Sequence, residues 1–143
     1  MTSQSPTPIE RPEVLSGRTH KASTPCGNCY VVVNRLGEGV GGNIVEVFCS
    51  IGKSGACSSA FLEGLGRLTS LALRAGIEPF QITKTLSNIS CSQTIWGNPH
   101  LSSQPTRSCL DIVAKVLELE SGVDVGPPQE RKSSGGDSDT GKD

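Results

Sequence analysis

The chain has 143 residues, with 13 basic and 14 acidic side chains and a formal net charge of −1. This length suits a single domain, and the near-neutral charge excludes electrostatic recruitment of nucleic acid or of an anionic membrane as the main function. Five aromatic residues are also too few for a platform that stacks the bases of a single strand. Because no apolar run approaches the roughly 20 residues of a membrane helix and the first residues lack a signal-peptide pattern, we expect a cytoplasmic protein.

The apolar residues concentrate in the middle of the chain. Residues 1–13 and 121–143 hold only four of them and are rich in proline, serine, glycine and charged residues. Such segments cannot offset their ordering entropy by burial, so we expect both to be disordered tails. The domain is therefore predicted to span residues 14–120.

Three strands are predicted in the first part of the domain. They cover residues 15–24, 28–34 and 43–51, and the β-branched run at 31–33 is the strongest strand signal in the chain. The turn Pro25-Cys26-Gly27-Asn28 separates the first two strands, and a glycine-rich stretch at 37–42 precedes the third. This order predicts an antiparallel sheet.

The pattern then changes to helical spacing over about residues 58–75. The apolar positions 61, 64, 65, 68, 71, 72 and 75 fall on one arc of this helix, and Leu62 and Leu73 extend this apolar face, so we expect the helix to be buried on most sides. Gly64 and Gly66 are tolerable there if another backbone packs close to them. The narrow opposite stripe is polar and consists of Ser59, Glu63, Arg67, Ser70 and Arg74. Gly76 is suited to cap the helix at its C-terminus.

Two further helices are predicted after this one. The first begins at Pro79, which suits an initial helical turn, and runs to about residue 89. The second follows a turn-rich loop and opens on a capping box formed by Ser108 and Asp111. Strands followed by helices predict an α+β fold, in which an antiparallel sheet of about three or more strands carries about three helices packed on one face.

The cysteines suggest a metal site. Cys26 and Cys29 are separated by two residues, and Cys91 and Cys109 lie far along the chain, so four thiolates could close a tetrahedral structural zinc site. The alternative is that Cys29 packs in a strand and the other three are small buried residues. For Cys109, a position at a helix N-terminus could lower the pKa of the thiol, although we expect its role to be structural.

The sequence Gly52-Lys53-Ser54-Gly55 lies between a strand and a helix, as phosphate-binding loops do. Lys53, Ser54 and Gly55, with Arg67 and Arg74 nearby, are therefore candidates for binding a phosphate or nucleotide. The full phosphate-loop motif fails, because it needs a glycine where this chain has Val47. The alternative is a tight turn beside an exposed helix face on which Glu63 and Arg67 form an ion pair.

Three sequence segments together resemble the TSCPD domain. They are RPEVLSGRTHKASTPCGNCYVVVN, EVFCSIGKSGACSSAFLEGLGRLTSLALRAGI, and the pair Ser90-Cys91 with Ser108-Cys109-Leu110-Asp111. The resemblance covers about residues 11–119. It departs at the motif that names the family, where this chain has Arg-Ser-Cys-Leu-Asp (residues 107–111) in place of Thr-Ser-Cys-Pro-Asp.

The family occurs as a C-terminal module of adenosylcobalamin-dependent ribonucleotide reductases and as small stand-alone proteins. The resemblance therefore implies an accessory or assembly domain in deoxyribonucleotide synthesis, with the catalytic chain of a reductase as partner. It does not imply catalysis, because residues 14–120 cannot contain the barrel, cysteines and cobalamin site of a reductase. The residues leave two alternatives: a stand-alone protein that binds a nucleotide or phosphate compound, and a zinc-stabilised interaction protein. The small core and the glycine-bearing helix would also suit a symmetric homodimer.

Overall fold

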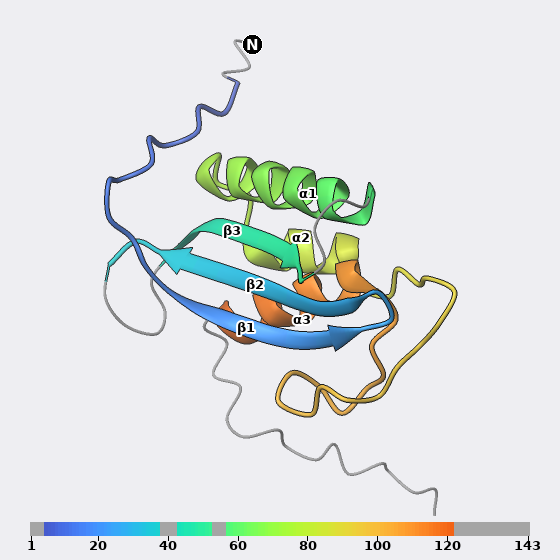
Figure 1. Cartoon of the computed structure of the whole chain (residues 1–143). Coiled ribbons are helices and arrows are strands. Elements are labelled where there is room, and N and C mark those ends of the chain that lie inside the picture. Colours follow the sequence, from blue (N-terminus) through green and yellow to red (C-terminus); the bar gives the residue numbers. More distant parts are fainter. Residues whose placement is uncertain (1–4, 38–42, 53–56, 122–143) are drawn as a thin grey trace, which may run out of the picture.

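The computed structural model describes residues 5–37, 43–52 and 57–121. Strands β1 (Ser16–Thr24), β2 (Gly27–Arg35) and β3 (Ile44–Ile51) come first, and helices α1 (Cys57–Arg74), α2 (Pro79–Leu86) and α3 (Cys109–Glu120) follow (Figure 1). The sheet has the order β1-β2-β3, and both pairs of neighbours are antiparallel. The predicted α+β fold is confirmed.

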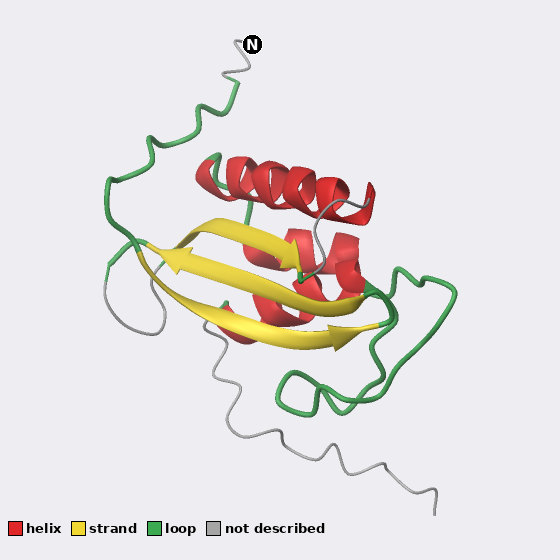
Figure 2. Ribbon diagram, in the orientation of Figure 1, coloured by secondary structure: helices red, strands yellow, loops and turns green. Residues whose placement is uncertain are grey.

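The core lies on one face of this sheet. Strand alternation places Ala22, Val31 and Cys49 on the same face, since His20 pairs with Val31 and Val31 with Cys49. Helix α3 covers that face, and α2 packs against α3 behind it (Figure 2). The side chains that α3 buries completely are all aliphatic: Ile112, Val113, Ala114, Val116 and Leu117.

Helix α1 lies against the outer edge of β3 (Figure 1). A Cβ atom at Gly66 would stand 3.0 Å from the carbonyl oxygen of Val47, so the helix and strand backbones are close together there. The Ser70 hydroxyl accepts a hydrogen bond from the Val47 N–H (2.9 Å), and its oxygen is 3.1 Å from the Val47 carbonyl oxygen. One serine therefore engages both backbone groups that this edge residue turns away from β2.

The prediction that this helix is buried on most sides was wrong for its main apolar arc and for Ser70, although Leu62 and Leu73 are buried as predicted and strand backbone packs close to Gly66. The residues that α1 buries are Leu62, Gly66, Thr69, Ser70 and Leu73. The apolar arc lies on the outside, where Phe61 is 78% exposed, Leu68 66% and Leu71 46%. The reason is the sheet edge, because a helix can approach strand backbone closely only through small side chains.

The segment before β1 contacts the domain at two points. The N–H of Ile9 donates to the carbonyl oxygen of Arg74 at the end of α1 (3.0 Å). The guanidinium of Arg11 pairs with the buried carboxylate of Glu46 (2.7 Å), which also accepts from the Asn34 amide. Residues 1–4 and 122–143 of the predicted tails lie outside the described residues.

Candidate functional site

A groove of about 620 Å³ opens between α1, residues 89–91 and the start of α3. Its α1 wall includes three large apolar side chains, Phe61, Leu65 and Leu68, and Ile89 and Leu110 stand on the other side. None of the described residues that line it carries a charged side chain. The remaining lining residues are small, polar or sulfur-bearing, or lie deeper in α1: Cys26, Ser58, Ala60, Leu62, Gly64, Ser90, Cys91, Ser108 and Cys109.

The wall opposite α1 is held by the first turn of α3. The Ser108 hydroxyl accepts a hydrogen bond from the Asp111 N–H (3.1 Å) and donates to the carbonyl oxygen of Ile89. The Asp111 carboxylate accepts from the N–H groups of Asn88 and Arg107, both at 3.1 Å. The predicted N-cap is confirmed, and the same two side chains also position the loop that carries Ile89.

Asp111 is charged in this setting. Burial raises the pKa of its carboxyl, but the hydrogen bonds from Lys115 and from the two backbone N–H groups outweigh burial and bring the pKa below its usual value. Lys115 donates to it at 2.8 Å. This chain has leucine at position 110, where the family motif has proline. The substitution leaves the arrangement complete, because none of the hydrogen bonds of Ser108 and Asp111 involves residue 110.

Three of the four cysteines predicted as zinc ligands, Cys26, Cys91 and Cys109, line the groove. The fourth, Cys29, is fully buried on the core face of β2, where burial raises its pKa to about 12. Strand alternation explains the separation, because Cys29 points into the core whereas Cys26 lies in the turn before β2. Within residues 5–37, 43–52 and 57–121, no group of three or more cysteine, histidine, aspartate or glutamate side chains is arranged to hold a metal ion. Zinc binding stays a prediction.

The Cys109 thiol is not activated by its helix. Burial raises its pKa, the Thr24 hydroxyl at 3.5 Å counteracts this in part, and the neighbouring Cys26 and Cys91 raise the pKa further. The direction is opposite to the one that a helix N-terminus alone would produce. The raised pKa favours a structural role for Cys109 over a nucleophilic one.

Of the residues predicted to bind phosphate, the two that the structure describes, Arg67 and Arg74, do not line the groove. Lys53, Ser54 and Gly55 lie outside the described residues. Arg67 forms the predicted ion pair with Glu63 (2.6 Å), with both side chains exposed on α1. Arg74 lines a different cavity.

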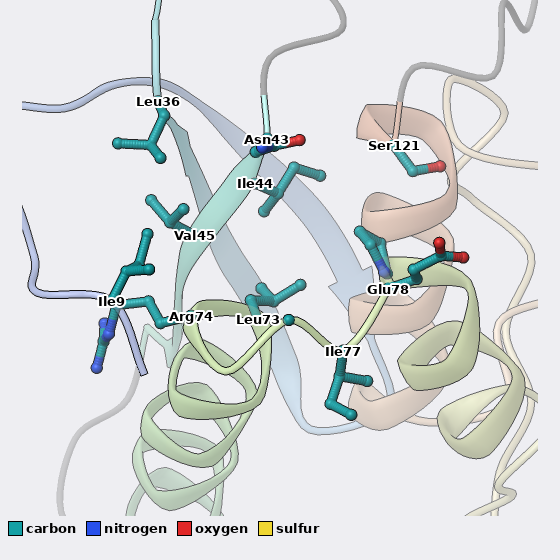
Figure 3. A pocket seen from close by; sticks show the side chains of 12 residues that line it. Ile9, Leu36, Asn43, Ile44, Val45, Leu73, Arg74, Ile77, Glu78 and Ser121 are labelled. Atoms are coloured by element: carbon teal, nitrogen blue, oxygen red, sulfur yellow. The ribbon is translucent and has the colours of Figure 1, made fainter. Parts of the chain in front are cut away.

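That second cavity measures about 340 Å³ and lies where the N-terminal segment, the start of β3 and the α1–α2 connection meet (Figure 3). Ile9, Val45 and Leu73 supply apolar walls, and Arg74 and Glu78 are its charged members. The formal charges of its described lining residues therefore sum to zero, which gives this smaller cavity no net charge with which to select an ionic ligand.

Sequence analysis missed a buried charge cluster at the end of α3. The carboxylate of Glu120 is 2.6 Å from His20 Nε2 and 3.3 Å from Arg18 Nε, and it forms a further close ion pair with Arg35. Burial raises the pKa of Glu120, but the hydrogen bonds with His20 and Arg35 outweigh burial and lower it overall. Strand alternation could have indicated this cluster, because Arg18, His20 and Arg35 all fall on the core face of their strands.

Comparison with known protein families identifies one that matches this chain. The model of the TSCPD domain matches residues 2–121 of the chain. No curated protein and no solved structure matches. In the described part of the chain, none of the helices combines the length and the apolar character needed to cross a bilayer.

Proposed function

Because this chain belongs to the TSCPD domain family, we propose that it is a non-catalytic accessory or assembly module of an adenosylcobalamin-dependent ribonucleotide reductase. Its partner is the catalytic chain of the reductase, and any turnover belongs to that chain. The module acts in the cytoplasm, in deoxyribonucleotide synthesis.

The apolar groove is the observation that supports a polypeptide partner. A volume of about 620 Å³ is enough for several side chains. A nucleotide would bring phosphate charges to a surface whose described lining residues include no cation, whereas an apolar peptide segment would bury Phe61, Leu68 and Ile89. The groove therefore favours docking of a protein segment over capture of a phosphate compound.

The test is binding of the full chain to a purified catalytic chain of such a reductase, measured by calorimetry. Ile89→Asp places a charge in the groove without removing a core residue, and we expect it to weaken binding by about tenfold or more. Phe48→Asp is the matched control, because Phe48 is 51% exposed on β3 but does not line the groove. Absence of binding, or equal losses in the two variants, would contradict the proposal.

The nucleotide alternative is tested in the same preparation. If the module docks a protein segment, nucleoside diphosphates and triphosphates leave its melting temperature unchanged. A rise in melting temperature that Lys53→Ala abolishes would instead support nucleotide binding by residues 52–55.

A further inference from the structure

Strand β1 forms the open edge of the sheet. The sheet has the order β1-β2-β3, and α1 lies along the outer edge of β3, so the outer edge of β1 is the one left over (Figure 2). The N–H of Ser23 donates to the side-chain oxygen of Asn98, and the side-chain nitrogen of Asn98 donates to the carbonyl of Ser23 (2.8 Å each). The backbone of Ser23 therefore faces away from β2. Because backbone direction alternates along an antiparallel strand, the backbone groups of Thr19 and Lys21 face the same way.

The outward backbone groups of Thr19 and Lys21 are open to a further strand. Within residues 5–37, 43–52 and 57–121, no hydrogen bond engages their N–H or carbonyl groups on that side, and both residues are exposed. A row of such groups on an edge strand is a template for pairing with another extended segment. Asn98 closes the edge at Ser23, so an added strand would pair with the residues before it.

The charge of β1 indicates which kind of segment fits this edge. Arg18 and Lys21 are both exposed, and β1 contains no acidic residue. The Glu120 carboxylate, 3.3 Å from Arg18, is shared with two other basic side chains of the buried charge cluster. In the described part of the chain, Lys21 forms no ion pair. Pairing with β1 of a second copy would bring like charges together, whereas an acidic segment would be attracted.

The spacing of the two cations defines the segment further. Arg18 and Lys21 lie three residues apart, so their side chains are on opposite faces of the sheet. In an added strand, the residues opposite these two are also three apart and lie on the matching faces. Acidic residues at positions i and i+3 of that strand would therefore each face one cation.

We propose that the outer edge of β1 binds an extended acidic segment of a partner protein, which adds a fourth strand to the sheet. The backbone groups of Thr19 and Lys21 supply the hydrogen bonds, and the two flanking cations select the acidic residues. This surface is separate from the groove, because none of these residues lines it. The inference is therefore independent of the reductase proposal.

Amide hydrogen exchange of the full chain tests the added strand. The probe is the peptide Thr-Glu-Val-Thr-Glu-Val with both ends blocked, which has acidic residues three apart. The N–H groups of Thr19 and Lys21 should exchange rapidly in the free chain, and peptide at about ten times its Kd should slow them about tenfold. The N–H groups of His20 and Ala22, which face β2, should change little.

Three results of this experiment would overturn the proposal. The first is unchanged exchange at Thr19 and Lys21 in excess peptide. The second is slow exchange in the dilute free chain, which would mean that another segment of this chain already covers the edge. The third is protection that rises with protein concentration in the absence of peptide, which would identify a second copy as the occupant.

Substitutions test the charge requirement. Lys21→Glu should weaken peptide binding by about three- to tenfold. Lys84→Glu is the matched control, because it makes the same change in net charge at an exposed position on α2. A peptide with lysine in place of both glutamates should bind more weakly than the acidic peptide by a similar factor or more. Equal binding of the two peptides, or equal losses in the two variants, overturns the selection of an acidic segment.

Thr19→Pro tests the backbone hydrogen bonds. Proline removes the outward N–H and is tolerated on an edge strand whose N–H faces solvent. Thr19→Val is the control, because it keeps that N–H. We expect Thr19→Pro to lose peptide binding and Thr19→Val to retain it, and equal affinities would overturn the added strand. If Thr19→Pro does not fold, the exchange of the wild-type amides and the Lys21 variant decide the question.

Discussion

Helices α1 and α3 differ in the side chains that they bury. Helix α3 buries large aliphatic residues such as Ile112 and Leu117, whereas α1 buries Gly66 and Ser70 and exposes Phe61. The difference follows from what each helix packs against. Helix α3 covers the face of the sheet, where side chains interdigitate, and α1 lies along an edge, where strand backbone is in reach.

This difference has a functional consequence. A helix that covers a sheet face uses its apolar side for the core of its own domain. Because α1 meets the sheet edge through the small or polar residues Gly66, Thr69 and Ser70, with Leu62 and Leu73 at either end, the rest of its apolar side stays available to another chain. The following substitutions test this contrast, beginning with the largest expected effect.

Glu120→Gln removes the charge that anchors the end of α3. The substitution leaves Arg35 and His20 buried beside a neutral amide, so we expect a loss of about 3 kcal/mol in the free energy of unfolding at pH 7. Because folding lowers the pKa of Glu120, its stabilisation is complete above the unfolded pKa of about 4.3 and is lost as the pH falls through the folded value. Urea unfolding at pH 7 and at lower pH measures both effects.

Glu118→Gln is the control for this charge, since Glu118 is exposed on the same helix. It should change stability by no more than about 0.5 kcal/mol. In acid, the gap between wild type and Glu120→Gln should narrow. A gap that stays constant with pH would mean that the carboxylate charge is not what stabilises this end of α3.

Gly66→Leu tests the close approach of α1 to β3. Its Cβ would stand 3.0 Å from the carbonyl oxygen of Val47, and the rest of the side chain has to displace the helix, so we expect a loss of about 2 to 3 kcal/mol. Gly64→Leu is the matched control on the open side of the helix and should gain up to about 1 kcal/mol through helix propensity. Chemical denaturation at low protein concentration measures both. Equal effects at the two glycines would contradict the edge packing.

Local features of the fold could be predicted from sequence, and tertiary ones could not. Alternation and helical spacing located all six elements, and the cap at Ser108 followed from four neighbouring residues. The spacing in α1 revealed an amphipathic helix but not which side faces the domain, because that depends on the hydrogen bonds of Ser70 with Val47, 23 residues away. The pairing of His20 with Glu120, 100 residues apart, was equally beyond local patterns.

The candidate site likewise has features that the sequence could predict and features that it could not. The positions of Cys26 and Cys91 in the groove required the loop before α3 to fold back to the turn between β1 and β2, which spacing does not encode. Alternation could have assigned Cys29 to the core, since it lies two residues from the buried Val31. The strand pattern alone therefore allowed Cys29 to be removed from the four predicted zinc ligands.

Ser70→Ala tests the hydrogen bonds at the sheet edge. The substitution leaves the N–H and the carbonyl of Val47 without their side-chain partner in a buried place, so we expect a loss of about 1 to 2 kcal/mol. Thr85→Ala is the control, because the Thr85 hydroxyl donates only to the carbonyl of Gln81 within its own exposed helix. Thermal and urea unfolding should separate the two variants by about 1 kcal/mol. Indistinguishable variants would show that Ser70 adds nothing at this edge.

Phe61→Ser has the smallest expected effect on the free energy of unfolding. It distinguishes most clearly whether the apolar arc of α1 faces the core or the solvent. If Phe61 belonged to the core, its removal would cost about 3 to 5 kcal/mol. With 78% of the residue exposed, we expect a change within about 0.5 kcal/mol in dilute solution, whereas Ala at the neighbouring buried Leu62 should cost about 2 to 5 kcal/mol.

Urea unfolding of the two variants measures these changes. Losses of similar size at Phe61 and Leu62 would contradict the outward orientation of the apolar arc of α1. A loss at Leu62 alone is the result expected if Phe61 lies on the solvent-exposed side of the helix, where it lines the groove.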